Sequence, residues 1–115
     1  MLPQAISPDI LKCVRYIDIH YTEMITVDNL VRHSNRSKSS LSSLFKAEMG
    51  MTITEYITQQ RISHAKTLLH FSDKSLSEIS EFLNFSSQSY FQNVFKKQVG
   101  VTPLEYRKQK NSSTN

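Results

Sequence analysis

The chain has little of what builds sheets, disulfide frameworks or membrane spans. Its 115 residues include two glycines, three prolines, one cysteine and no tryptophan. Because a sheet of several strands needs many turns, the scarcity of glycine and proline favours an all-α protein. A lone cysteine, Cys13, leaves no disulfide framework and no metal site built on several thiolates. No apolar run approaches the roughly 18 residues that a membrane span requires.

Patterns of common catalytic and metal sites are also missing. No two of the four histidines fall four residues apart, and no cysteine or acid completes a ligand set with them. There is no glycine-rich loop of the kind that holds phosphates. We therefore expect neither an enzyme nor a bound cofactor or metal ion.

The charge of the chain is moderately basic. Lysine and arginine number 14 against 10 acids, which gives a net charge of +4. This excess permits a polyanionic partner such as nucleic acid but does not require one, because many soluble domains carry a similar charge. The opening sequence MLPQAISPDI lacks the basic start and the apolar stretch of a signal peptide. We expect a soluble cytoplasmic protein with no membrane partner.

Capping patterns divide the chain into helices. Ser7-Pro8-Asp9 predicts a helix start, with serine as N-cap, proline in the first turn and an acid at the positive end of the helix dipole. Each of Thr52, Ser75 and Thr102 precedes a glutamate by three residues, the pattern of a capping box. Apolar residues at helical spacing follow these starts. We expect residues 1–6 to be a linker remnant and residues 111–115 a frayed tail.

An internal repeat relates the two halves of the chain. Displaced by fifty positions, residues 37–56 share eight identities with residues 87–106. The matches include Gly50 and Gly100, each placed where a glycine commonly ends a helix. Within each half a short helix, a turn and a longer helix follow one another, which is the order of a helix-turn-helix unit.

The run RSKSSLSSLFK can be interpreted as a serine-rich linker or as a helix. Its residues Leu41, Leu44 and Phe45 have the spacing of a helix with one buried face. Its repeat partner, SQSYFQNVFK, carries apolar residues at the same positions. We therefore predict helices at about 38–49 and 87–98, the first with small hydroxyls on its outer face.

Two stretches resemble a known family: LFKAEMGMTITEYITQQRISHAKTLL and SEISEFLNFSSQSYFQNVFKKQVGVTPLEYRK. They are similar to the DNA-binding domain of AraC/XylS-type bacterial transcription regulators, and the similarity covers about residues 7 to 110. The resemblance implies a seven-helix domain, in which helix-turn-helix subdomains at 7–52 and 71–110 are joined by a long linker helix at 53–70. One departure is Asn84, where the family has glycine, and asparagine tolerates the left-handed conformation that this turn needs.

The resemblance also implies a function. It implies sequence-specific binding of double-stranded promoter DNA, with the two recognition helices in successive major grooves. It further implies RNA polymerase as a partner and activation as the commoner mode of regulation. Dimerisation, if any, would use an N-terminal domain absent from this chain, so we expect a fragment of a longer regulator, associated with the bacterial nucleoid.

Positions opposite the buried stripes predict the residues that contact DNA. The candidates for reading bases lie on the outer faces of the two recognition helices: Ser39, Ser42, Ser43, Gln88, Ser89, Gln92 and Asn93. Glutamine and asparagine can each form a bidentate pair with adenine, worth about 1–3 kcal/mol of discrimination, whereas serine gives single, promiscuous bonds. We therefore predict that the second unit reads bases, while the first mainly docks on phosphates and senses groove shape.

Candidates for phosphate contacts are cations near these helices and serines at their N-termini. They are Arg36, Ser37, Lys38, Lys46, Arg61, Ser87, Lys96 and Lys97. Arg61 is included through the family resemblance alone, and Arg107 is either a further phosphate contact or a structural ion-pair partner.

A helical protein-interaction module without DNA binding is the alternative. It would explain the capping boxes and the apolar stripes, but it would not predict matched polar faces on both second helices. Binding through phosphates must weaken steeply with salt, so the salt dependence of a gel shift distinguishes the two functions.

Overall fold

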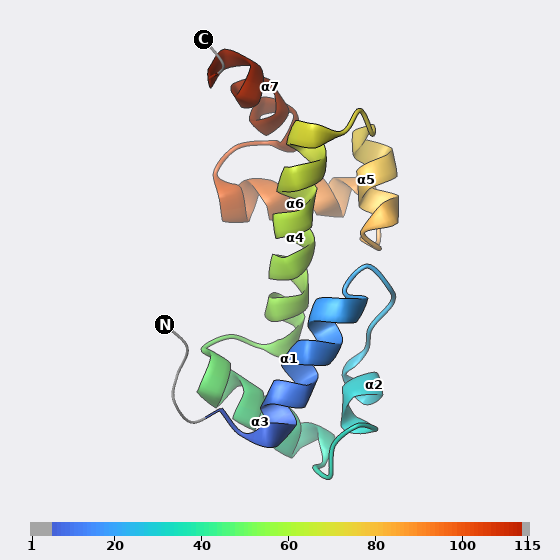
Figure 1. Ribbon diagram of the computed structural model, residues 1–115, viewed down its shortest axis with the longest axis vertical. Helices are drawn as coiled ribbons and strands as arrows, with labels where there is room; N and C mark the ends of the chain where they lie inside the picture. The colour runs from blue at the N-terminus through green and yellow to red at the C-terminus, as the bar shows by residue number, and fades with distance from the viewer. Residues whose placement is uncertain (1–5, 114–115) are drawn as a thin grey trace. The chain divides into compact units, whose positions relative to one another are not determined.

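The computed structural model describes residues 6–113, and all regular structure in this range is α-helical (Figure 1). The helices are α1 (Pro8–His20), α2 (Val27–Val31), α3 (Lys38–Met49), α4 (Ile53–Phe71), α5 (Leu76–Phe82), α6 (Gln88–Val99) and α7 (Pro103–Ser113). The predicted seven-helix, all-α class is confirmed over the described residues. The tail expected from residue 111 begins inside α7, and residues 1–5 and 114–115 lie outside the described part.

The chain forms two compact units that divide between Gln60 and Arg61, within α4. The first unit holds α1 to α3 and the N-terminal part of α4, and the second holds the remainder of α4 and α5 to α7. Each part of the helix predicted as a linker therefore contributes to the packing of one unit.

In the first unit, α1 and α2 both pack against α3 (Figure 1). The buried side chains come from all four helices of the unit: Ile10, Cys13, Ile17, Leu30, Leu41, Phe45, Ile53 and Ile57. The Phe45 and Tyr56 rings meet edge to face with centroids 5.9 Å apart. The Tyr56 hydroxyl donates to Asp18 over 2.8 Å, and burial together with this hydrogen bond raises the pKa of Tyr56 to about 12.

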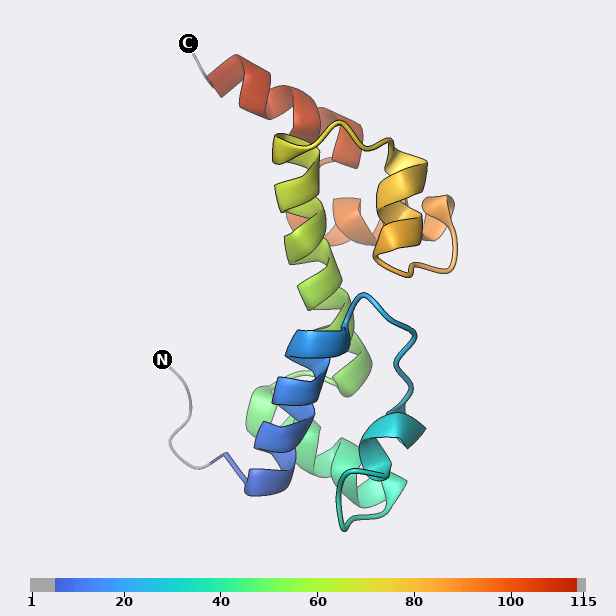
Figure 2. The same ribbon diagram turned by 45° about the vertical axis from the view of Figure 1, so that its right-hand side comes forward.

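The second unit repeats part of this packing, because α5 packs against α6 as α2 does against α3. Here α5 and α7 pack against α6 (Figure 2). Its buried apolar residues in α4, α5, α6 and the turn before α6 are Ile62, Ala65, Leu69, Ile79, Leu83, Phe85, Phe91 and Phe95. The helix α7 adds its buried Pro103. Phe95 and Tyr106 meet edge to face at 5.5 Å, as their repeat partners do in the first unit. The repeat in sequence therefore corresponds to a repeat in packing.

Left-handed backbone ends α3 and α6 and shapes the turn between α5 and α6. Gly50 and Gly100 follow α3 and α6 with φ of 77° and 96°, the conformation expected of glycine at this place. Asn84 has φ of 64°, so the left-handed turn predicted at the departure from the family is present. Asparagine is among the few residues that adopt this conformation routinely.

The three predicted capping boxes are confirmed. At the starts of α4, α5 and α7, the N-cap hydroxyl accepts from the N3 amide, and the N3 glutamate accepts from the N-cap amide. A fourth box was missed: Thr26 and Asn29 exchange the same two bonds at the start of α2. The N3 position of this box holds asparagine instead of the usual glutamate or glutamine, so the sequence pattern does not predict it.

Candidate nucleic-acid interface

The outer face of α3 consists of hydroxyls and one cation. Ser39, Ser43 and Lys46 are exposed and Ser42 is half-buried, while Leu41 and Phe45 on the opposite side are fully buried. Within the described residues, the hydroxyls of Ser39, Ser42 and Ser43 make no hydrogen bond. They are therefore available to an external partner.

An open hollow of about 340 Å³ adjoins this face. The candidates Ser42, Ser43 and Lys46 line it together with Val27, Thr52, Ile53 and Thr54. Neither threonine was expected from the sequence to be a site residue. Thr52 was identified only as a helix cap, and periodicity within one helix cannot show that the next helix starts against its face.

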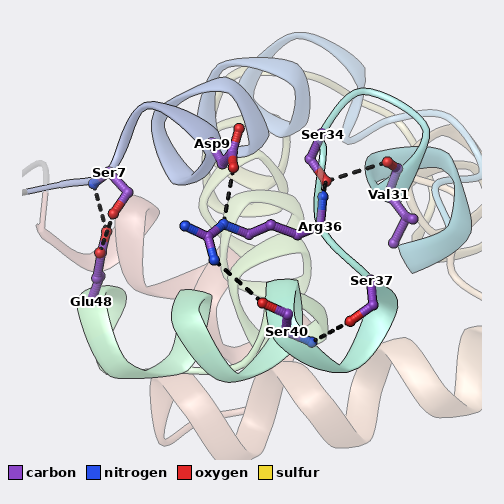
Figure 3. A network of polar contacts seen from close by, with 8 residues as sticks. All are labelled: Ser7, Asp9, Val31, Ser34, Arg36, Ser37, Ser40 and Glu48. Atoms are coloured by element: carbon purple, nitrogen blue, oxygen red, sulfur yellow. Dashed lines mark hydrogen bonds and ion pairs between the residues drawn. The ribbon is translucent and has the colours of Figure 1, made fainter.

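Arg36 and Lys38, two phosphate candidates, have partners in the first unit. The Arg36 guanidinium donates through Nε to Asp9 Oδ2 at 2.9 Å and through Nη1 to the Ser40 hydroxyl at 3.3 Å (Figure 3). Lys38 Nζ lies 3.7 Å from Asp28 Oδ1, and both side chains are largely exposed. An exposed pair such as Lys38–Asp28 contributes about 0–1 kcal/mol, so Lys38 can exchange its partner for a phosphate at little cost.

A second polar link joins the start of α1 to the end of α3. The amide and hydroxyl of Ser7 both donate to the Glu48 carboxylate, the amide over 2.7 Å (Figure 3). These hydrogen bonds lower the pKa of Glu48. The first helix is thus capped by a carboxylate from α3, and its own Ser7 side chain makes no cap. Together with Arg36, this link fixes α3 on α1 near both ends of α3.

The outer face of α6 carries amides. Gln88, Ser89 and Asn93 are exposed and Gln92 is half-buried, while Phe91 and Phe95 on the opposite side are fully buried. The Gln88 amide donates to Gln92 Oε1 over 3.5 Å, at the limit of a hydrogen bond. The face thus offers side chains that can donate and accept at once.

The remaining candidates of the second unit surround α6. Lys96 and Lys97 are exposed in its last turn, and the Ser87 hydroxyl caps its start by accepting from the Tyr90 amide at 3.0 Å. Arg61 is half-buried on α4, and burial lowers the pKa of its guanidinium.

Arg107 has a structural role. Its guanidinium donates to the carbonyl oxygens of Leu69 at 2.9 Å, Ser72 at 3.2 Å and Leu68 at 3.4 Å. These carbonyls belong to the last turn of α4 and the residue after it, where the helix itself no longer supplies every backbone oxygen with a partner. The Leu68 oxygen also accepts from the amide and the hydroxyl of Ser72. The ion pair expected as one interpretation of Arg107 is not found within the described residues, because its partners there are helix-end carbonyls and not an acid.

Neither a metal site nor a membrane helix is found in residues 6–113. No group of three or more histidine, cysteine or acidic side chains there could hold a metal ion. No helix of this range is long and apolar enough to cross a membrane. Cys13 is buried in the first unit, and burial raises the pKa of its thiol.

Two helix-turn-helix units are therefore present, α2–α3 and α5–α6, each with a polar outer face on its second helix. In this class of protein the second helix is the one that enters the DNA major groove. A family of helix-turn-helix domains matches residues 30–109 of the chain.

Relatives of known role share this region. The xylose operon regulatory protein of Haemophilus influenzae is 38% identical over 101 residues, which are 88% of this chain and 26% of that protein. The regulatory protein PocR of Salmonella typhimurium is 36% identical over 103 residues, 90% of this chain and 34% of that protein. The chain thus spans about a quarter to a third of the length of these relatives.

Solved structures share the fold. The C-terminal domain of AraT, a response regulator from Geobacillus stearothermophilus, superposes with a TM-score of 0.84 at 31% identity, over 90% of this chain and 86% of that one. The DNA-binding domain of AdpA, solved with a target DNA, gives 0.86 at 24% identity over 94% and 97% of the two chains. The chain belongs to the AraC/XylS family of helix-turn-helix DNA-binding domains of transcription regulators.

Proposed function

We propose that the chain is the DNA-binding part of a transcription activator and that α3 and α6 enter successive major grooves of promoter DNA. The observation that carries the proposal is the matched pair of polar outer faces on the two second helices, each opposite fully buried aromatic or aliphatic side chains. A bundle that binds only proteins has no need for the same register of polar residues in both units.

The two helices read DNA unequally in this proposal. Asn93 and Gln92 on α6 can each pair with the N6 and N7 atoms of adenine, which discriminates that base by about 1–3 kcal/mol. Their repeat partners on α3 are Ser43 and Ser42, whose hydroxyls donate or accept single bonds without selecting one base. The second unit therefore specifies sequence, and the first positions the protein on the backbone.

Phosphate contacts in this proposal come from equivalent places in the two units. Lys46 and Lys96 occupy the same outer position in the last turns of α3 and α6, and both are exposed. The hollow beside α3 adds the hydroxyls of Thr52 and Thr54 to those of its serines. Lys97, Lys38 and Arg36 extend the cationic surface, and Arg61 contributes from its half-buried place on α4.

The remaining expectations concern the protein as a whole. We propose that it acts in the bacterial cytoplasm, at the nucleoid, and that it contacts RNA polymerase when bound at a promoter. The relatives are longer than this chain, which supports an additional domain that would sense an effector or dimerise.

DNA binding is tested by selecting sequences from random DNA with the 115-residue chain and measuring affinity for the selected site against salt. We expect log K to fall linearly with log salt concentration, with a slope of about −0.9 for each phosphate contacted. No salt-dependent binding to any selected or promoter DNA would refute the proposal and favour the protein-interaction module.

The unequal readout is tested with pairs of variants that the repeat matches. Asn93→Ala and Gln92→Ala should each weaken binding to the selected site by about five- to 150-fold, with relaxed preference at one position. Their controls, Ser43→Ala and Ser42→Ala, should change affinity less than about threefold and leave the preference intact. The opposite ranking would show that α3 is the reading helix.

A further inference from the structure

An open groove of about 400 Å³ lies on the first unit, and its lining includes no residue of α3. Four of its lining residues come from α1, and one follows α2: Lys12, Arg15, Tyr16, Ile19 and His33. On the helical wheel of α1, Ile19 projects opposite the buried Ile10 and Ile17, with Lys12 and Arg15 on either side of it. No part of the proposed DNA interface uses this groove.

The floor of the groove is apolar and held in place. Ile19 has 72% of its surface exposed, although isoleucine is among the residues most often buried. The Tyr16 ring stacks obliquely on His20 at 4.3 Å and on His33 at 5.1 Å, so it is fixed between two other rings. A rigid aromatic wall beside an exposed aliphatic side chain is the surface that an apolar anchor of a partner fills.

The rim of the groove is cationic and unneutralised. Lys12 and Arg15 are exposed, and neither forms an ion pair within residues 6–113. The acids of the same helix are engaged elsewhere: Asp9 pairs with Arg36, and Asp18 accepts from Tyr56. The groove therefore presents two positive charges that an anionic partner would complement.

We propose that this groove docks a short acidic peptide segment of a partner protein, with one aromatic or aliphatic side chain seated between Ile19 and Tyr16. Acidic residues of the segment would flank the anchor and pair with Lys12 and Arg15. A phosphate backbone is the poorer match, because it has no use for an exposed isoleucine or an aromatic wall, and α1 is not the second helix of a helix-turn-helix unit. The proposal does not depend on DNA binding.

The test uses a fluorescein-labelled peptide of about twelve residues, rich in Asp and Glu with a central Phe-Leu, and the 115-residue chain. We expect saturable binding by fluorescence polarisation and amide shifts at residues 11–20 and 33 in a ¹⁵N NMR titration. A second peptide with Phe-Leu replaced by Ser-Ser should bind at least about tenfold more weakly, since an anchor in a hot spot contributes more than about 1.4 kcal/mol.

Variants locate the binding on the protein. Ile19→Ser and Lys12→Glu should each weaken peptide binding by at least about fivefold, whereas Lys66→Glu, the same charge reversal on α4, should not. Circular dichroism of each variant establishes that it is folded, and the affinity of Ile19→Ser for selected DNA should equal that of the parent chain.

Other occupants of the groove give other results. Absence of peptide binding, or binding indifferent to Ile19, would overturn the proposal. So would a loss of DNA affinity in Lys12→Glu without peptide binding, which would make the rim a phosphate surface. Self-association that Ile19→Ser abolishes, again without peptide binding, would assign the groove to a second copy of the chain.

Discussion

Replacing Arg107 with methionine should destabilise the second unit. Methionine keeps most of the apolar stem but removes the guanidinium that donates to three carbonyls at the end of α4. A hydrogen bond to a charged group contributes about 1.5–3 kcal/mol, and a cation at a helix C-terminus about 0.3–1 kcal/mol. Arg107 is partly exposed and two of its three contacts are long, so we expect a loss of about 2 kcal/mol in total.

Thermal unfolding followed by circular dichroism measures this loss. With about 2.1 cal/mol/K of unfolding entropy per residue, a chain of 115 residues has about 0.24 kcal/mol/K, so 2 kcal/mol lowers Tm by about 8 °C. Arg107→Lys keeps the charge without the planar fork and should lose about half as much. Lys66→Met, which removes a charge from the middle of α4, is the control.

The same variants separate the structural role from a phosphate contact. If Arg107 contacted phosphate, Arg107→Met would reduce the salt slope of DNA binding by about one while leaving Tm unchanged. That result, or a loss of stability below about 0.5 kcal/mol, would refute the assignment of Arg107 as a helix-end cap.

Two further predictions concern pH and backbone conformation. Hydrogen bonds from serine or threonine lower the folded-state pKa of Glu48, Glu78 and Glu105 below 4.5. The stabilisation that these glutamates give is therefore present above pH 4.5 and is lost as the pH falls through the lowered values. Urea unfolding between pH 3 and 6 should show this decline, with a shallower decline in Glu78→Gln; an unchanged decline in that variant would contradict the role given to Glu78. Gly100 has φ of 96°, and beyond its chain neighbours no atom lies within 4 Å of the place that a Cβ would take, so Gly100→Ala should lose about 1 kcal/mol of stability through backbone strain alone. Gly50→Ala, at φ of 77° and with the same open surroundings, should lose a similar amount, and no loss in either variant by thermal unfolding would show that φ does not decide.

Much of the fold could be predicted because its determinants are local. Three capping boxes, two terminal glycines and the left-handed Asn84 depend on residues within a few positions of one another. The spacing of apolar residues then settles which face of α3 and α6 is buried. The internal repeat supports these assignments, because the same spacing of apolar residues occurs in both units.

The parts that could not be predicted depend on residues distant in the sequence. Arg36 meets Asp9 across 27 positions, and Ser7 meets Glu48 across 41. Arg107 reaches the end of a helix 38 positions earlier. A cation on an outer surface has the same pattern whether it binds phosphate, an acid or a carbonyl, so only the packed structure distinguishes these partners.

The serines at and within α3 have different structural roles, and this difference affects how such a protein can change the DNA sequence that it binds. Ser37 caps the helix and Ser40 accepts from Arg36, so substitutions at these positions disturb folding. The hydroxyls of Ser39, Ser42 and Ser43 make no hydrogen bond within the described structure. Mutations there are nearly free of a stability penalty, so this face can drift and acquire amides or charges one codon at a time. With the unequal readout proposed above, new promoter preferences can evolve in the first unit while the second keeps the old site occupied.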